Sequence, residues 1–256
     1  MKHSTTIVAI AISIIFLLQA EIVDAAEVKI LSALGVKEVM NDLAPKFERA
    51  TGHKLVIAFA NVGAIVKRVQ DGETADLIVV PRQGIDRFVR DGKTSADNVT
   101  VLARGGLGVA VRKGAPKPDI SPQEALNRAL LAAKSITYLD PAGGGVSGVH
   151  VAKVLDRMGI ANDVRAKIIL HRNADAAGVM IVNGEAEIGI NLIQEFMPMA
   201  GVDLVGPLPG DLQLTIVYSA AIMTGAKEPA ASKALVDFLR TPEAASVIKA
   251  KGMEPG

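Results

Sequence analysis

The sequence predicts an α/β protein with two lobes, each built on a parallel or mixed sheet flanked by helices, and two crossings between the lobes. A length of 256 residues is enough for one two-lobed domain or two small ones. Half of the residues are hydrophobic and 21% are charged, which is typical of a globular chain. Segments with strand and helix patterns alternate in two series, and a glycine-rich stretch separates the series.

The first 26 residues have the three-part pattern of a secretory signal peptide. Lys2 gives a basic start, residues 7–20 form an uncharged apolar run, and small residues at 23–26 offer a cleavage site. The run is shorter than the ~18 residues expected of a membrane-spanning helix. The alternative interpretation is a membrane anchor that is not cleaved. The chain has no cysteine, which excludes a lipoprotein anchor. We therefore expect residues 1–26 to be a signal peptide and the protein to be exported to the periplasm.

The first series begins directly after this segment and predicts a parallel sheet. Helices are expected from Gly35 to Thr51 and from Ala64 to Val69, although Pro45 conflicts with an unbroken first helix. The expected strands are residues 27–32, 54–60 and 76–80.

A glycine-rich strand at residues 104–111 is expected to cross to a second lobe. Ser121 and Glu124 form a capping box for a helix over residues 122–133. The other elements expected here are strands at 135–139, 166–170 and 188–192, and helices at 148–158 and 174–183. The long apolar segment 211–223 is expected to cross back, followed by a helix at 229–239 and another from Pro242. The predicted lobes are thus residues 27–108 with 212–256, and residues 109–211.

Composition excludes several classes of function. The 28 basic and 27 acidic residues give a net charge of +1, and aromatic residues make up 3% of the chain, so nothing favours a nucleic-acid partner. The absence of cysteine excludes thiol catalysis, disulfides, iron–sulfur clusters and cysteine-based zinc sites. His53, His150 and His171 are scattered and do not form a metal-binding spacing, so we expect no metal and no cofactor.

Ligands of such sheets bind at the carboxyl ends of the strands, where helices begin. Exposed N–H groups and the helix dipole favour an anion there. The glycines at 143, 145 and 148 fit a dinucleotide motif, but no acidic residue follows about 20 positions later, so that interpretation is weak. The candidate ligand contacts are Ser32, Gly35, Asn61, Gly63, Gly144, Gly145, Ser147 and Asn191.

Several of these residues have a structural alternative. Ser147 can cap a helix, Asn61 can be a turn residue, and Asn191 can make an internal hydrogen bond. A serine-nucleophile elbow is not favoured, because Ser147 is followed by Gly148 and Val149 rather than by the required spacing of glycines. The sequence identifies no catalytic residue.

Four segments resemble the molybdate-binding-protein-like branch of the type 2 periplasmic solute-binding proteins. They are FANVGAIVKRVQDGETADLIVV (59–80), LDPAGGGVSGVHVAKVL (139–155), GEAEIGI (184–190) and TPEAASVIKAKGMEP near the end. The resemblance covers essentially the whole chain after the signal peptide. It implies two α/β lobes with an anion clamped between them, delivery to an ABC-type permease, and a monomer.

The chain departs from the molybdate pattern of this branch at three places. Gly35 stands where the branch has a serine, Asn61 and Val62 stand at a serine pair, and Leu192 stands at a tyrosine. The loss of hydroxyl donors favours a larger anion, such as an organic polycarboxylate, over molybdate.

Some periplasmic proteins similar to this branch are enzymes, aconitate isomerase among them. That resemblance implies a base near the ligand, in addition to groups that bind carboxylates. The candidate bases are His150, His171, Glu195 and Tyr218. A passive receptor needs none of them near the ligand, so their placement relative to the cleft discriminates between a receptor, which we favour, and an isomerase.

Overall fold

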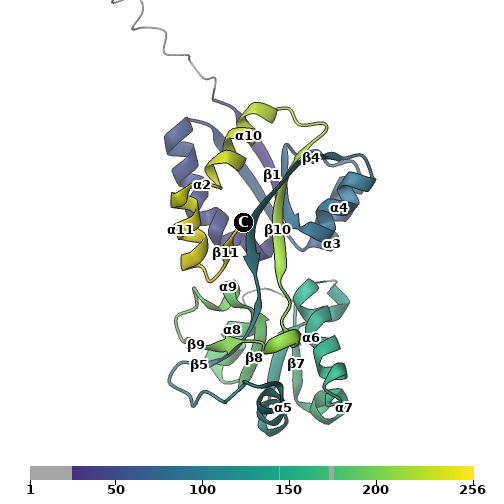
Figure 1. Ribbon diagram of the computed structural model, residues 1–256, viewed down its shortest axis with the longest axis vertical. Helices are drawn as coiled ribbons and strands as arrows, with labels where there is room; N and C mark the ends of the chain where they lie inside the picture. The colour runs from purple at the N-terminus through teal and green to yellow at the C-terminus, as the bar shows by residue number, and fades with distance from the viewer. Residues whose placement is uncertain (1–24, 144, 173–175) are drawn as a thin grey trace, which may run out of the picture.

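The protein consists of two lobes, each with a sheet of its own (Figure 1). The computed structural model describes residues 25–143, 145–172 and 176–256. The predicted signal peptide lies almost entirely outside these residues. The two-lobed α/β fold predicted from the sequence is confirmed.

The first lobe is built on a six-stranded mixed sheet within the described residues. Its strands are β1 (Glu27–Ala33), β2 (Lys54–Ala60), β3 (Leu77–Pro81), β4 (Thr94–Gly105), β10 (Ile216–Met223) and β11 (Glu254–Pro255). The order across the sheet is β11-β4-β10-β3-β1-β2. β1 pairs in parallel with β2 and β3, whereas β10 is antiparallel to β3 and β4. The carboxyl ends of β1, β2 and β3 therefore lie at one edge, as the strand–helix alternation predicts.

The second lobe is built on a five-stranded mixed sheet. Its strands are β5 (Leu107–Arg112), β6 (Ile136–Leu139), β7 (Ile168–His171), β8 (Ile188–Leu192) and β9 (Val202–Pro207). Their order is β7-β6-β8-β5-β9, with β6 parallel to β7 and β8, and β5 antiparallel to β8 and β9. The two crossings are the turn from β4 to β5 and the segment before β10 (Figure 1).

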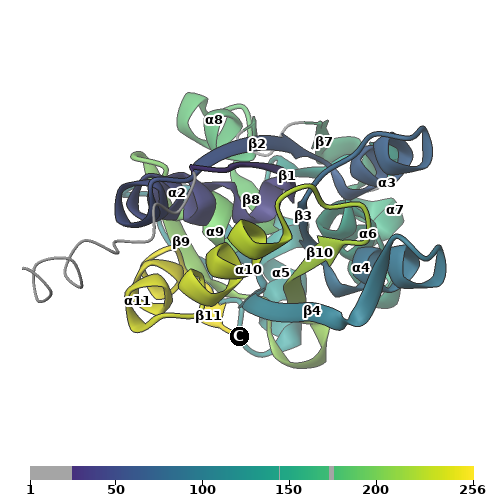
Figure 2. The same cartoon turned by 90° about the horizontal axis from the view of Figure 1, so that it is seen from above.

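Helices cover both faces of the first sheet. They are the 3-10 turn η1 (Leu34–Val36) and the helices α2 (Lys37–Thr51), α3 (Val62–Gln70), α4 (Arg82–Arg90), α10 (Pro229–Phe238) and α11 (Pro242–Ala250). Viewed from above, α2, α10 and α11 lie on one side of the sheet, and α3 and α4 lie on the other (Figure 2).

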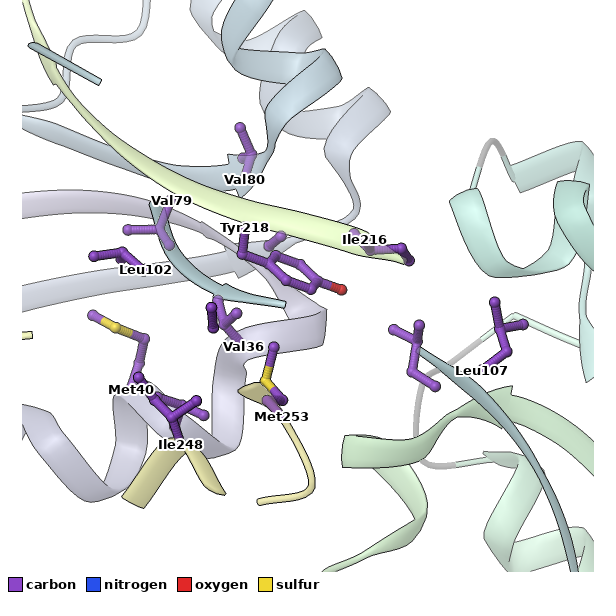
Figure 3. Packing of buried hydrophobic residues seen from close by; sticks show 14 of the residues in the cluster. Val36, Met40, Val79, Val80, Leu102, Leu107, Ile216, Tyr218, Ile248 and Met253 are labelled. Atoms are coloured by element: carbon purple, nitrogen blue, oxygen red, sulfur yellow. The ribbon is translucent and has the colours of Figure 1, made fainter. Parts of the chain in front are cut away.

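The second lobe has helices of its own. They are α5 (Gln123–Ala132), α6 (Val146–Arg157), α7 (Ala161–Val164), α8 (Ala176–Asn183) and α9 (Ile193–Phe196), with 3-10 turns η2 (Pro141–Gly143), η3 (Arg165–Lys167) and η4 (Gly210–Leu212). One cluster of buried hydrophobic side chains extends through both lobes. Figure 3 shows part of it, where Val36 and Met40 pack near Tyr218 of β10.

Four local predictions need correction. Pro45 lies inside an uninterrupted α2. The expected capping box is wrong, because Pro122 is the N-cap of α5 and no side chain caps that helix. The crossing strand expected at 104–111 is two strands separated by Gly106, and the helix expected at 148–158 already begins at Val146. This earlier start places Ser147 in the first turn of α6.

The sequence patterns missed several elements. The helices α4, α7 and α9 and the strands β4, β9 and β11 have no counterpart among the predicted segments, apart from the last residues of β4. Residues 95–98 of β4 are exposed, and most of β9 is half-buried, so neither strand has the long apolar run that marks a buried strand.

Candidate functional site

A cavity lies between the two lobes, where the carboxyl ends of β1, β2, β3, β6 and β8 converge. Its volume is about 50 Å³, whereas one water needs only ~10–15 Å³ measured in this way. From the first lobe it is lined by Ala33, Leu34, Gly35, Ala60, Asn61, Val62, Pro81, Ile216 and Tyr218. From the second lobe it is lined by Leu139, Gly145, Val146, Ser147, Leu192 and Glu195. The cavity therefore has the position expected of a site for a small ligand held between lobes.

Two helices, one from each lobe, begin at the cavity wall. Asn61 is the N-cap of α3 and Gly145 is the N-cap of α6, and neither helix has a side-chain cap or an acidic residue in its first turn. The first N–H groups of a helix have no acceptor within the helix and carry a partial positive charge. Both helix ends can thus donate hydrogen bonds to an anion in the cavity.

Gly148 lets α6 approach the end of β6. A Cβ atom at this position would overlap the carbonyl oxygen of Leu139, which is a backbone atom and cannot move aside easily. The side chain of Leu139 also packs where a Cβ of Gly145 would lie. The glycines of this loop therefore hold the start of α6 close to the strand, and Ser147 is 4% exposed at the cavity wall.

The charge of the cavity wall is unusual for an anion site. Among the described residues that line the cavity, Glu195 is the charged one, and none is Lys, Arg or His. Backbone dipoles and neutral side chains must therefore balance the charge of a bound anion. Asn191 is fully buried on β8, and its Nδ2 donates a hydrogen bond of 2.6 Å to Oε2 of Glu195. This bond fixes the position of the carboxyl group.

Tyr218 of β10 brings a phenol to the same cavity. Its side chain is 2% exposed, and its hydroxyl oxygen is directed towards the second lobe (Figure 3). Burial raises the pKa of Tyr218, and the nearby Glu195 raises it further. The phenol is therefore protonated at neutral pH and is a hydrogen-bond donor.

Four of the predicted ligand contacts meet in this cavity. Gly35, Asn61, Gly145 and Ser147 all line it. They come from three different loops, as expected for strands whose carboxyl ends share an edge.

Three of the other predicted contacts do not line the cavity. Ser32 is buried in β1, and its Oγ donates to the Ala33 carbonyl at 3.4 Å. Gly63 is an exposed residue of α3 that is not part of the cavity wall. Asn191 reaches the site through Glu195 rather than by lining it. Gly144 lies outside the described residues.

Of the four candidate bases, Glu195 and Tyr218 line the cavity. His150 lines a separate hollow of about 310 Å³ together with Lys153 of the same helix, and its Nε2 donates to the Leu212 carbonyl at 2.8 Å. His171 is buried at the end of β7 and is not among the residues that line the site. Two of the four candidate bases thus lie at the cavity wall, and the two histidines do not.

Sequence reasoning missed the apolar part of the wall. Pro81 and Ile216 line the cavity because β10 pairs with β3, which brings the end of β3 next to the start of β10. No local pattern marks either residue, because an antiparallel pairing between segments so far apart is set by the sheet order.

Two further findings concern the described part of the chain. No helix between residues 25 and 256, as far as the structure describes them, is long and apolar enough to cross a membrane. Nor do three or more His, Asp or Glu side chains in that part gather closely enough to hold a metal ion.

Residues 28–254 match the family of bacterial extracellular solute-binding proteins, and the chain belongs to this family. This membership confirms the resemblance noted in the sequence. It also supports a place of action outside the cytoplasm.

Two curated relatives differ in their described roles. An aconitate isomerase of a Pseudomonas species is 34% identical over 232 residues, which are 88% of this chain and 87% of that protein. The molybdate-binding protein ModA of Azotobacter vinelandii is 27% identical over 237 residues, 89% of this chain and 90% of that protein.

Solved structures share the fold at lower identity. The substrate-binding domain of a putative molybdenum ABC transporter from Clostridium difficile has a TM-score of 0.74 at 14% identity, covering 90% of this chain and 99% of that one. The periplasmic molybdate-binding protein of Azotobacter vinelandii has a TM-score of 0.69 at 19% identity, covering 88% and 98%.

Proposed function

We propose that this protein is a periplasmic receptor that binds a small organic anion with more than one carboxylate group between its lobes and presents it to an ABC-type permease. The observation that carries the proposal is the meeting of two uncapped helix N-termini from opposite lobes at one cavity, whose described lining residues include no Lys, Arg or His. Each helix end suits one carboxylate group, because its N–H groups point towards a single bound anion.

The same wall is poorly suited to a compact oxyanion such as molybdate. Ser147 and Tyr218 are the hydroxyl-bearing side chains among the lining residues. Glu195 adds a carboxyl group, which repels a concentrated negative charge unless a proton lies between the two. A ligand that spreads its charge over separate carboxylates can keep that charge at the two helix ends.

A thermal-shift experiment on the exported form tests the proposal. The probes are cis-aconitate, trans-aconitate, citrate, molybdate, tungstate, sulfate and phosphate. A ligand that binds the native state stabilises it by about 2.7 kcal/mol at a concentration of 100 times its Kd. We expect tricarboxylates to raise the Tm most. A larger shift with molybdate or tungstate would refute the carboxylate preference.

A second candidate function is isomerisation of a tricarboxylate. It is favoured by the presence of Glu195 and Tyr218 at the cavity and by the aconitate isomerase relative. In this reaction a base removes a proton from the methylene carbon of cis-aconitate. The double bond shifts by one position, and a proton adds to the former vinyl carbon, so the product is an isomer and no oxidant or cofactor is needed. Glu195, held by Asn191, is the group that can accept the proton.

Proton NMR of cis-aconitate in D₂O separates the two functions. An isomerase produces trans-aconitate and introduces solvent deuterium at the methylene carbon, and Glu195→Gln abolishes both changes. A receptor leaves the spectrum of cis-aconitate unchanged apart from line broadening.

A further inference from the structure

The hydroxyl group of Tyr218 occupies the space that a side chain at position 35 would fill. A Cβ atom on Gly35 would overlap the Tyr218 hydroxyl oxygen and lie 2.9 Å from its Cζ. Both residues line the cavity, although Gly35 lies in η1 and Tyr218 comes from β10. The absence of a side chain at residue 35 is therefore what admits the phenol to the cavity wall.

Gln194 of the second lobe holds this hydroxyl group in place. Its Nε2 is 3.1 Å from the Gly35 carbonyl oxygen and 3.4 Å from the Tyr218 hydroxyl. A carbonyl oxygen can only accept, so the group facing it must be the NH₂ end of the amide, which can only donate. Gln194 thus donates to the Tyr218 oxygen, and the proton of the phenol points away from Gln194.

We propose that Tyr218 is the hydrogen-bond donor that determines ligand specificity in the cleft, with Gln194 as the positioning residue and Gly35 as the residue that makes room. This inference deepens the proposed function and rests on the cleft being the ligand site. Burial and the neighbouring Glu195 raise the pKa of Tyr218, which keeps the donor protonated.

The arrangement also couples the donor to closure of the lobes. Gln194 belongs to α9 of the second lobe, whereas the two groups it contacts belong to the first lobe. It is 3% exposed in the present arrangement. Separation of the lobes breaks both contacts, so the phenol is fully oriented only when the cleft is closed around its ligand.

Calorimetric titration with cis-aconitate and molybdate tests the donor role. Tyr218→Phe removes one hydrogen bond to a charged group and should weaken binding about tenfold to hundredfold. Tyr138→Phe is the matched control, because Tyr138 is the other tyrosine of the chain, is also buried and does not line the cavity. Its affinity should equal that of the wild type. A Tyr218→Phe variant that is folded and binds as tightly as the wild type overturns the inference.

Absorbance gives an independent readout. The chain has two tyrosines and no tryptophan, so in Tyr138→Phe the near-ultraviolet tyrosine band comes from Tyr218 alone. A phenol that donates to a carboxylate absorbs at longer wavelength, so a titration that releases heat should also shift this band to the red. Binding without a shift contradicts the proposal.

A double-mutant cycle tests the geometry. Gly35→Ala should weaken binding by a factor similar to that of Tyr218→Phe, because the new methyl group displaces the hydroxyl. In the Tyr218→Phe background, Gly35→Ala should weaken binding much less, because the hydroxyl oxygen that overlaps the new methyl group is absent. Equal costs in both backgrounds overturn the role of Gly35.

The outcomes separate this inference from the proposed function. If the wild-type protein binds molybdate but not cis-aconitate, and Tyr218→Phe weakens that binding, the carboxylate ligand is refuted and the donor role of Tyr218 is supported. Binding of cis-aconitate unaffected by Tyr218→Phe refutes the donor alone. Wild-type protein that binds neither probe overturns both.

Discussion

Glu195 is the residue that most affects the charge of the cavity wall. It lines a cavity that otherwise favours negative charge, and Asn191 fixes it with a short hydrogen bond. Tyr218 faces the same space as a protonated donor. A carboxyl group and a protonated phenol from opposite lobes thus line one small cavity.

Replacement of Glu195 by glutamine should strengthen the binding of a carboxylate ligand. Glu195→Gln removes a negative charge from the wall and keeps the side-chain shape, so the affinity for cis-aconitate should rise about fivefold, equivalent to about 1 kcal/mol. Calorimetric titration measures this, with Glu243→Gln on the distant α11 as the control. Weaker binding would show that the carboxyl group contacts the ligand as a hydrogen-bond acceptor.

Away from the site, Glu73 should make stability depend on acid pH. Hydrogen bonds from Arg68, together with Lys29, lower the pKa of Glu73 from 4.5 to about 2. A lowered pKa adds stability above the unfolded value, and this stability is lost as the pH falls from about 4.5 to about 2. Urea unfolding at pH 7 and pH 3 should show a smaller acid loss for Glu73→Gln than for wild type. Glu124→Gln, at an exposed carboxyl, should behave as wild type.

At the scale of elements, the site depends on where helices start. α3 and α6 begin at the cavity wall because each follows directly from the end of a strand or a short turn of its lobe. α6 can do so because Gly148 leaves room for the end of β6. The helix start, rather than any charged side chain, then supplies the donors.

Two glycine substitutions test the contributions of α6 and α3 separately. Gly148→Ala forces α6 away from the Leu139 carbonyl, so it should lower the free energy of unfolding by about 1–3 kcal/mol and weaken ligand binding. Gly63→Ala places a methyl group in open space within α3 and should raise stability by up to about 1 kcal/mol. Urea unfolding and calorimetric titration measure both effects. A Gly63→Ala variant with weakened binding would place that residue at the ligand after all.

At the scale of the whole molecule, two crossings hold the lobes in register. One is the turn at Gly105 and Gly106, and the other is the segment that contains Gln213. The Gln213 side chain accepts from Leu107 N at 2.9 Å and donates to Leu107 O at 2.8 Å, so it ties the second crossing to the first. Closure of a two-lobed protein requires such segments to bend together.

Loss of this link should destabilise the molecule. Gln213→Leu leaves the backbone groups of Leu107 without these partners, so the free energy of unfolding should fall by about 1–3 kcal/mol. Gln70→Leu, at an exposed glutamine at the end of α3, is the matched control. Equal urea midpoints for the two variants would contradict a linking role of Gln213.

Much of the architecture could be inferred from local pattern alone. Strands such as β3 and β8 are short runs of apolar residues, and their alternation with helices predicted two α/β lobes and the edge at which a ligand binds. The loops around Gly35, Asn61 and Ser147 were correctly placed at that edge, because the carboxyl ends of parallel strands must share it. Composition alone excluded thiol chemistry, because the chain has no cysteine.

The remaining features depend on contacts between distant segments. Tyr218 reaches the cavity because β10 inserts between β3 and β4, and Gln194 meets it across the boundary of the lobes. That Glu195 lines the cavity while His150 and His171 do not also rests on three-dimensional placement. Periodicity describes how one segment buries its own side chains, whereas the composition of a cleft depends on which segments pack together. The fold class and the edge of the candidate site thus follow from the order of residues, and the meeting of Glu195 with Tyr218 follows from packing between the two lobes.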